Sequence, residues 1–359
     1  MPKKRLYNIH SKEVLREKLS VEAADRTTLS FYKYVSIDRL DTVRDELYHG
    51  LDGIGVLGRI YIATEGINGQ ITVPSTRLSE LKDYLDDHVH FADLRLNIAV
   101  QSDDLSFVKL IVRQRTKIVA DGLDDRAIDF SQRGEHVDAQ RFNDLAKDPD
   151  TLLIDMRNHY ESEVGHFQGA LRPSVATFRE SLPIIAEVIA AQKPKQVLMY
   201  CTGGIRCEKA SAYFKSLGHD DIYQLDGGII NYAHTVDKQN LENRFVGKNF
   251  VFDERLGERI TEDVLAECHQ CGDPCDQHTN CSNDACHLLF IQCKACAEKF
   301  DNCCSSLCRD FNVLTESEKK QQRRDLVFNG NRYPHARYSN LTGLQLKTGE
   351  DTPTPPSEN

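Results

Sequence analysis

Residues 197–210 read VLMYCTGGIRCEKA, an apolar strand that runs into a glycine-containing loop and then into a helix. The loop extends from Cys201 to Arg206, and its two glycines allow backbone N–H groups to point inward at the N-terminus of the helix. Such N–H groups and a nearby guanidinium favour thiolate over thiol, so we expect a lowered pKa for Cys201 at the mouth of the loop. The stretch therefore predicts an enzyme with Cys201 as its nucleophile, and the alternative is a small buried cysteine that only packs.

Strands and helices alternate on both sides of this loop. We expect strands at residues 151–154, 196–200 and 222–225, and helices at residues 142–148, 178–191 and 208–217. This alternation predicts an α/β domain, in which helices cover both faces of a parallel sheet. Ligands bind at the C-terminal ends of the strands in such sheets, which is where Cys201 lies.

The N-terminal third of the chain has another order of elements. We expect strands at residues 29–35, 58–63, 70–74, 91–100 and 107–119, and helices at residues 38–47 and 75–88. Between the second and third strands, the pair Asn68-Gly69 is a strong signal for a hairpin turn. The order β-α-β-β-α-β predicts a ferredoxin-like α+β domain.

The composition limits the class of protein. The chain has 359 residues, a hydrophobic fraction of 40% and a formal net charge of -10. It is long enough for two or three domains, and an RNA partner would need local positive charge because the chain as a whole is acidic. We find no export signal and no apolar stretch long enough for a bilayer, so we expect a cytoplasmic protein that does not bind a membrane.

Ten of the twelve cysteines lie between Cys268 and Cys308. In a chain without an export signal, this crowding favours metal binding over disulfides. The pairs Cys268-x-x-Cys271 and Cys293-x-x-Cys296 have zinc-ribbon spacing, and we expect these four to hold a structural zinc. The remaining six could complete a second site, which spacing alone does not assign, and an iron–sulfur cluster or unligated thiols are the alternatives.

The length of the reactive loop separates two chemistries. Four residues lie between Cys201 and Arg206. A cysteine phosphatase needs one more, so this smaller loop favours a sulfur-sized or smaller group on the cysteine. The middle domain resembles a rhodanese in this loop, in the turn at residues 155–157, in residues 165–170 and in the Asp-Gly-Gly at residues 226–228. In rhodaneses the matching cysteine carries a persulfide.

Three separated motifs extend the resemblance. CTGGIRCEK at residues 201–209, EGING at residues 65–69 and CHQC at residues 268–271 together resemble the tRNA uridine(34) hydroxylase family. The resemblance implies hydroxylation of C5 of the wobble uridine to 5-hydroxyuridine, with molecular oxygen as co-substrate and the tRNA anticodon loop as partner. No organic cofactor is evident. The resemblance also carries Cys201 over as the active-site residue and matches Cys207 to a second cysteine of the family motif.

The reacting groups would have separate roles. We expect a thiolate to add to C6 of uracil, which makes C5 a nucleophile toward an oxygen species, while Arg206 and the loop N–H groups stabilise the developing oxyanion. Cys207 is either the resolving partner of Cys201 or a thiol that only packs. We expect the turn at residues 155–157 to brace the end of the sheet and His166 to make a structural hydrogen bond, rather than to contact substrate.

These patterns together predict a multidomain chain of α/β and α+β type. We expect a lead-in at residues 1–25, a ferredoxin-like domain at 26–122, a linker at 123–140, a rhodanese domain at 141–240, a Cys-rich module at 241–314 and a polar, disordered tail at 315–359. The expected function is that of a tRNA uridine hydroxylase. The alternatives are a sulfurtransferase that carries persulfide on Cys201 and a non-catalytic RNA-binding adaptor, and the sequence does not indicate a protein partner.

Overall fold

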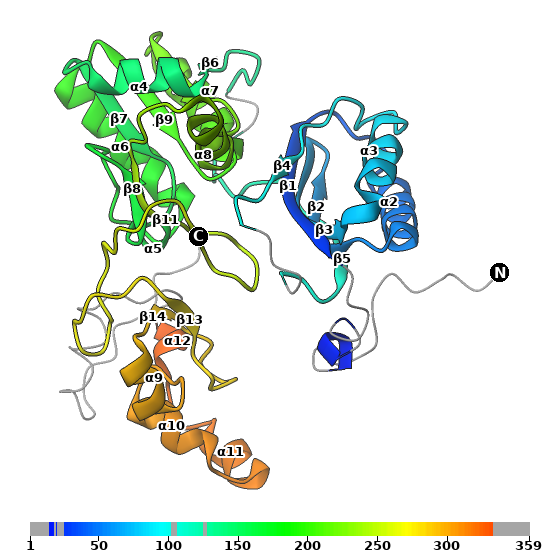
Figure 1. The fold of residues 1–359 in the computed structure, drawn as a ribbon, viewed down its shortest axis with the longest axis vertical. Helices are drawn as coiled ribbons and strands as arrows, with labels where there is room; N and C mark the ends of the chain where they lie inside the picture. The colour runs from blue at the N-terminus through cyan, green and yellow to red at the C-terminus, as the bar shows by residue number, and fades with distance from the viewer. Residues whose placement is uncertain (1–13, 18, 20–24, 102–105, 125–127, 333–359) are drawn as a thin grey trace. The chain divides into compact units, whose positions relative to one another are not determined.

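The structure is a computed structural model (Figure 1). It describes residues 14–17, 19, 25–101, 106–124 and 128–332. Two compact units divide the chain between Asp263 and Val264, and each is described by itself. Among the described residues, no helix has the length and apolar character needed to cross a membrane.

The N-terminal domain is a five-stranded sheet with two helices on one face, as Figure 1 shows. Its elements are β1 (Arg26–Tyr34), α2 (Leu40–Ile54), β2 (Leu57–Ala63), β3 (Gly66–Pro74), η1 (Ser75–Arg77), α3 (Leu78–Asp86), β4 (Asn97–Ile98) and β5 (Leu110–Gln114). The strand order is β4-β1-β3-β2-β5. The chain order and the antiparallel pairing of β1 with both β3 and β4 confirm the predicted ferredoxin-like fold, although β4 and β5 are shorter than expected.

The two faces of β1 have different neighbours. Leu29 and Phe31 belong to the same apolar core as Leu47 and Leu51 of α2. Side chains alternate between the faces of a strand, so the intervening positions of β1 point away from the helices. These positions are the polar and aromatic residues Ser30, Tyr32 and Tyr34.

The turn between β2 and β3 lies earlier than the sequence predicts. The two strands pair Ala63 with Gly66, so Asn68 and Gly69 lie inside β3 and the expected turn at that pair is wrong. The reason is the conformation of Gly66, whose φ of 147° is rarely adopted by a residue with a side chain. The earlier turn places Glu65 at the end of the hairpin.

The middle domain is a four-stranded parallel sheet of order β6-β10-β9-β7. Its elements are β6 (Glu135–Val137), α4 (Ala139–Lys147), β7 (Thr151–Asp155), α5 (His159–Ser162), β8 (Gly165–Phe167), α6 (Phe178–Gln192), β9 (Gln196–Tyr200), α7 (Ile205–Ser216), β10 (Ile222–Leu225) and α8 (Gly228–Gln239). Residues of α4 and α8 share one core cluster, and residues of α6 and α7 share another. The predicted α/β domain with a parallel sheet is therefore confirmed.

Strands outside residues 141–240 pair with strands inside that range at both ends of the domain. β6 lies within the segment expected to be a linker, and it pairs with β10 as an edge strand of the sheet. β11 (Phe245–Asn249) pairs with β8, and β12 (Glu258–Arg259) pairs with β11, so these strands fold with the first unit rather than with the Cys-rich module. Gly165 and Gly247 are paired residues of β8 and β11, and the absence of side chains there allows the strands to approach closely.

The second unit consists of a short hairpin and four helices among its described residues. They are β13 (His278–Asn280), β14 (Leu289–Ile291), α9 (Lys294–Phe300), α10 (Ser306–Asn312), α11 (Glu316–Gln322) and α12 (Asn329–Arg332). The expectation of disorder from residue 315 onward is wrong as far as residue 332. Thr315 caps α11, and Phe328 packs on Phe311 with ring centroids 4.8 Å apart. Residues 333–359 of the expected tail lie outside the described residues.

Candidate active site

The reactive loop joins the end of β9 to the start of α7. Gly204 is the N-cap of α7 and has a φ of 106°, a conformation that favours glycine. Its backbone N–H donates a hydrogen bond to Sγ of Cys201 over 3.1 Å. From behind the loop, the N–H of Ile229 donates to the carbonyl of Cys201 over 3.1 Å. The N-termini of two helices therefore fix the position of this cysteine.

The surroundings of Cys201 favour the thiolate. Burial alone would raise the pKa of this thiol. A hydrogen bond with Cys207, the positive charge of Arg206 and the backbone N–H groups of Arg206 and Gly204 oppose that effect and lower the pKa to about 6. Burial and the charge of Cys201 hold the pKa of Cys207 well above its ordinary value. Near neutral pH the pair therefore consists of a thiolate at Cys201 and a thiol at Cys207.

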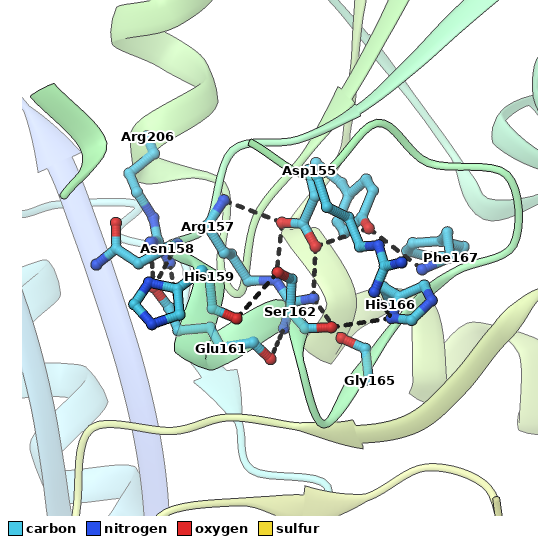
Figure 2. Close-up of polar contacts among 12 residues, drawn as sticks. Asp155, Arg157, Asn158, His159, Glu161, Ser162, Gly165, His166, Phe167 and Arg206 are labelled. Atoms are coloured by element: carbon cyan, nitrogen blue, oxygen red, sulfur yellow. Dashed lines mark hydrogen bonds and ion pairs between the residues drawn. The ribbon is translucent and has the colours of Figure 1, made fainter. Parts of the chain in front are cut away.

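Arg206 is held by a carboxylate that the sequence analysis did not identify. Its Nη1 and Nη2 atoms lie 2.6 and 2.8 Å from the two carboxylate oxygens of Glu161, as Figure 2 shows. Glu161 belongs to α5 and also accepts a hydrogen bond from the backbone N–H of Asn158, in a capping box. The Asn-x-x-Glu spacing of that box is the signal that could have pointed to Glu161. Arg206 therefore places a fixed positive charge near Cys201, and its guanidinium is already occupied.

The turn at residues 155–157 braces the sheet. Asp155 and Arg157 are fully buried and form an ion pair in which Nη2 and Oδ2 are 2.6 Å apart. Arg157 also donates to the carbonyl of Gly165 over 2.6 Å, and the hydroxyl of Tyr200 donates to Asp155 over 2.8 Å. Nδ1 of His166 lies 2.9 Å from the carbonyl oxygen of Ser162 (Figure 2). These contacts agree with the structural roles that the sequence predicts for these residues.

The face of β1 that points away from the helices packs against the reactive loop. Cys201 lies at the mouth of the loop, as the sequence predicts, and the residue is only 1% exposed. The hydroxyl of Tyr34 donates to the carbonyl of Ile205 over 3.2 Å, and a Cβ atom at Gly203 would lie 3.8 Å from Oγ of Ser30. Tyr34 and Ile205 are 171 residues apart in the chain, so no local sequence pattern predicts this contact.

Two charged residues that follow Cys207 anchor the N-terminal domain. Glu208 accepts a hydrogen bond from the hydroxyl of Tyr32 over 3.0 Å. Lys209 is 1% exposed and forms ion pairs with Glu65 and with Asp121. Two of the motifs that carry the family resemblance, residues 65–69 and 201–209, therefore meet through a partly buried ion pair.

Eight cysteines of the second unit form two groups of four. The first contains the four predicted ligands, and within each group all four sulfur atoms lie within 4.8 Å of one another. The members are Cys268, Cys271, Cys293 and Cys296 in the first group, and Cys281, Cys286, Cys304 and Cys308 in the second. Pairs of cysteines from the two groups alternate along the chain. Each group offers the four thiolates of a tetrahedral metal site.

Comparisons with known proteins find matches along most of the chain, and one matched family spans the boundary between the two compact units. Three domain families match: the UPF0176 acylphosphatase like domain at residues 26–118, the rhodanese-like domain at residues 138–235 and the rhodanase C-terminal domain at residues 246–309. A tRNA uridine(34) hydroxylase of Enterobacter sp. (strain 638) is 51% identical over 89% of this chain and 91% of its own length. A protein of the same name from Leptospira interrogans is 49% identical over 92% of this chain and 90% of its own.

Cys207→Ala should raise the pKa of Cys201 by about 1 to 2, because the thiolate loses a hydrogen bond that stabilises its charge. The titration is followed by the ultraviolet absorbance of the thiolate, as the difference between each protein and the same protein with Cys201→Ser. Cys275→Ala is the matched control, since Cys275 belongs to neither group of four cysteines. An unchanged midpoint in Cys207→Ala would show that Cys207 does not support the thiolate.

Proposed function

The chain belongs to the tRNA uridine(34) hydroxylase family, and from this we propose that it hydroxylates C5 of the wobble uridine of tRNA, with Cys201 as the nucleophile. The observation that supports the role of Cys201 most directly is its lowered pKa in a loop of backbone N–H donors. The wobble base lies in a single-stranded loop, so its extrusion into a protein site costs less than flipping from a duplex. A tRNA substrate is also the reason we propose a cytoplasmic location.

We propose that the reaction begins when the Cys201 thiolate adds to C6 of uracil. The new C6–S bond turns the C5–C4 carbonyl unit into an enolate, and C5 then attacks molecular oxygen. Cys207 reduces the resulting O–O bond by taking the outer oxygen atom, which leaves a hydroxyl group on C5. Loss of the C5 proton and cleavage of the C6–S bond restore the C5=C6 double bond and release Cys201.

The two cysteines also supply the electrons that this reaction needs. The oxygen atom on Cys207 leaves as water when Cys201 attacks Cys207 and forms a disulfide. In sum, uridine, one molecule of oxygen and two thiols give 5-hydroxyuridine, one disulfide and water. An external thiol then returns the disulfide to the two free cysteines.

The structure changes the role that we propose for Arg206. The sequence suggested that its guanidinium stabilises the oxyanion of the substrate, but both Nη atoms lie on Glu161 and the residue is 7% exposed. We therefore propose Arg206 as a positioning residue, which lowers the pKa of Cys201 through its fixed charge. The loop N–H groups are then the donors available to a developing oxyanion.

Purified protein, tRNA, oxygen and a thiol reductant should yield 5-hydroxyuridine at position 34, measured by mass spectrometry of digested tRNA. Cys201→Ser should abolish the product, because a serine hydroxyl is not ionised at neutral pH. Cys207→Ser should reduce turnover at least about tenfold, since the thiol that reduces the O–O bond is lost. Labelled molecular oxygen should appear in the product.

Other outcomes of this experiment would support other functions. A label that enters from water instead would contradict the oxygen-dependent reaction. Thiolated bases in the tRNA, with an added sulfur atom on Cys201, would favour the sulfurtransferase alternative. Catalysis that survives Cys201→Ser would remove this residue from the mechanism.

We further propose that each group of four cysteines holds one structural zinc ion. Four sulfur atoms at about 2.3 Å from a zinc ion lie about 3.8 Å from one another. Sγ atoms are 3.6 Å apart between Cys271 and Cys293, and 3.7 Å apart between Cys286 and Cys304. An iron–sulfur cluster distributes its cysteines over several iron atoms, which spreads the sulfurs further than a single ion does. The spacing therefore supports single ions, and zinc would supply structural cross-links in a unit with a small apolar core.

Protein purified without chelator should contain two zinc ions per chain, one for each group of cysteines. Cys304→Ser should lower the content to one ion and lower the melting temperature of the second unit, because the site loses a ligand and the core loses a cross-link. Cys303→Ser is the matched control, a neighbouring buried cysteine outside both groups, and should keep two ions. Metal analysis by mass spectrometry measures the zinc content of both variants. Stoichiometric iron would contradict the assignment.

A further inference from the structure

A pocket of about 250 Å³ lies beside the reactive loop. Its lining includes Tyr32 and Tyr34 of β1, Asn97 of β4, Arg95, and from the rhodanese domain Arg133 and Asp226. The volume is below the about 300–1,000 Å³ that is typical for drug-sized ligands, and it suits a single nucleobase. The pocket therefore combines the N-terminal domain with the domain that carries Cys201.

Asn97 is the polar group that distinguishes this pocket. The residue is 6% exposed and lines the pocket. In the part of the chain that the structure describes, its side-chain amide makes no hydrogen bond, and a Cβ atom at Gly203 would lie 3.7 Å from its Nδ2 atom. The amide is not closed off by protein, so water in the pocket reaches it and a ligand can replace that water. An unpaired amide that faces a pocket is therefore a group available to a ligand.

An amide matches the polar edge of uracil. It presents one donor and one acceptor side by side, and uracil presents its N3–H donor next to a carbonyl acceptor. N3 and C6 lie on opposite sides of the pyrimidine ring. A base that is held by its N3 edge therefore keeps its C5–C6 edge free for reaction with a thiolate.

The remaining lining of the pocket suits a nucleotide. The guanidinium of Arg133 lies 5.0 Å from the ring centroid of Tyr34, and flat aromatic and guanidinium groups are the surfaces on which unstacked bases rest. Arg95 pairs with Asp226 over 2.6 Å, with both side chains about 40% exposed, so a phosphate can compete for this guanidinium. The lining contains three cations, Lys33, Arg95 and Arg133, against the two carboxylates Asp93 and Asp226, which gives the pocket the local positive charge that an acidic chain needs to bind RNA.

The geometry points to this pocket as the binding site of the wobble uracil, with the amide of Asn97 as the group that pairs with its N3 edge and Arg95 as a contact to the adjoining phosphate. This inference rests on the proposed function, because it takes the wobble nucleotide as the ligand. It adds a residue that none of the recognised motifs contains. Asn97 is a specificity residue in this account, whereas Cys201 performs the chemistry.

The test compares two anticodon stem-loop RNAs, one with uridine at position 34 and one with an abasic site there. Dissociation constants are measured without oxygen, so that no turnover occurs. Asn97→Ala should weaken binding of the uridine RNA by about 5- to 150-fold, the range expected for one bidentate base contact, and should leave binding of the abasic RNA unchanged. Arg95→Gln should weaken both RNAs by the same factor, because a phosphate contact does not depend on the base.

The control is Ile98→Ala, a change at the next residue of β4 where the side chain is 44% exposed. It should leave the ratio of the two dissociation constants unchanged. Equal effects of Asn97→Ala on both RNAs, or no effect on either, would overturn the inference. Hydroxylation of the uridine RNA by the wild-type protein is assayed in parallel, so a failure of the pocket assignment is distinguishable from a failure of the proposed function.

Discussion

The negative charge on Cys201 is the constraint on which the rest of the site depends. A charge at a residue that is 1% exposed is costly unless fixed dipoles and charges surround it. The loop N–H groups, Cys207 and Arg206 supply them, and Arg206 in turn requires Glu161. Glu161 is held by the capping box of α5, so a short helix outside the loop contributes to the lowered pKa of Cys201.

The same arrangement also limits the access of a substrate base to Cys201. The loop reaches its buried position through contacts with β1 and through the ion pair between Lys209 and Glu65. A base can approach Sγ of Cys201 only if some of these contacts change, because the cysteine itself is covered. The hydroxyl contacts of Tyr32 and Tyr34 are single hydrogen bonds, which are weaker than the partly buried ion pair. RNA binding would therefore exchange contacts at the tyrosines while the ion pair keeps the two domains together.

Short-range features of the site could be predicted from the sequence, and long-range ones could not. Cys201, the glycines and Arg206 lie within one loop, where residue types determine the local geometry. Glu161 lies 45 residues from its partner Arg206, and Tyr32 lies 176 residues from its partner Glu208, so no spacing rule connects them. The Asn68-Gly69 signal failed for a related reason, since the pairing of β3 with β1 and β2 overrides a local turn preference. The two CxxC pairs predicted one group of cysteines correctly, whereas the second group has unequal spacings and needed the fold.

The most direct test of the nucleophile is a trapped complex with anticodon stem-loop RNA that carries 5-fluorouridine at position 34. Fluorine replaces the hydrogen that must leave C5, so the adduct between sulfur and C6 should accumulate. Mass spectrometry of the digested complex should then find the modified nucleotide on the peptide that contains Cys201. A complex that never forms, or one whose nucleotide is attached to another residue, would contradict the account of Cys201 as the thiolate that attacks the base.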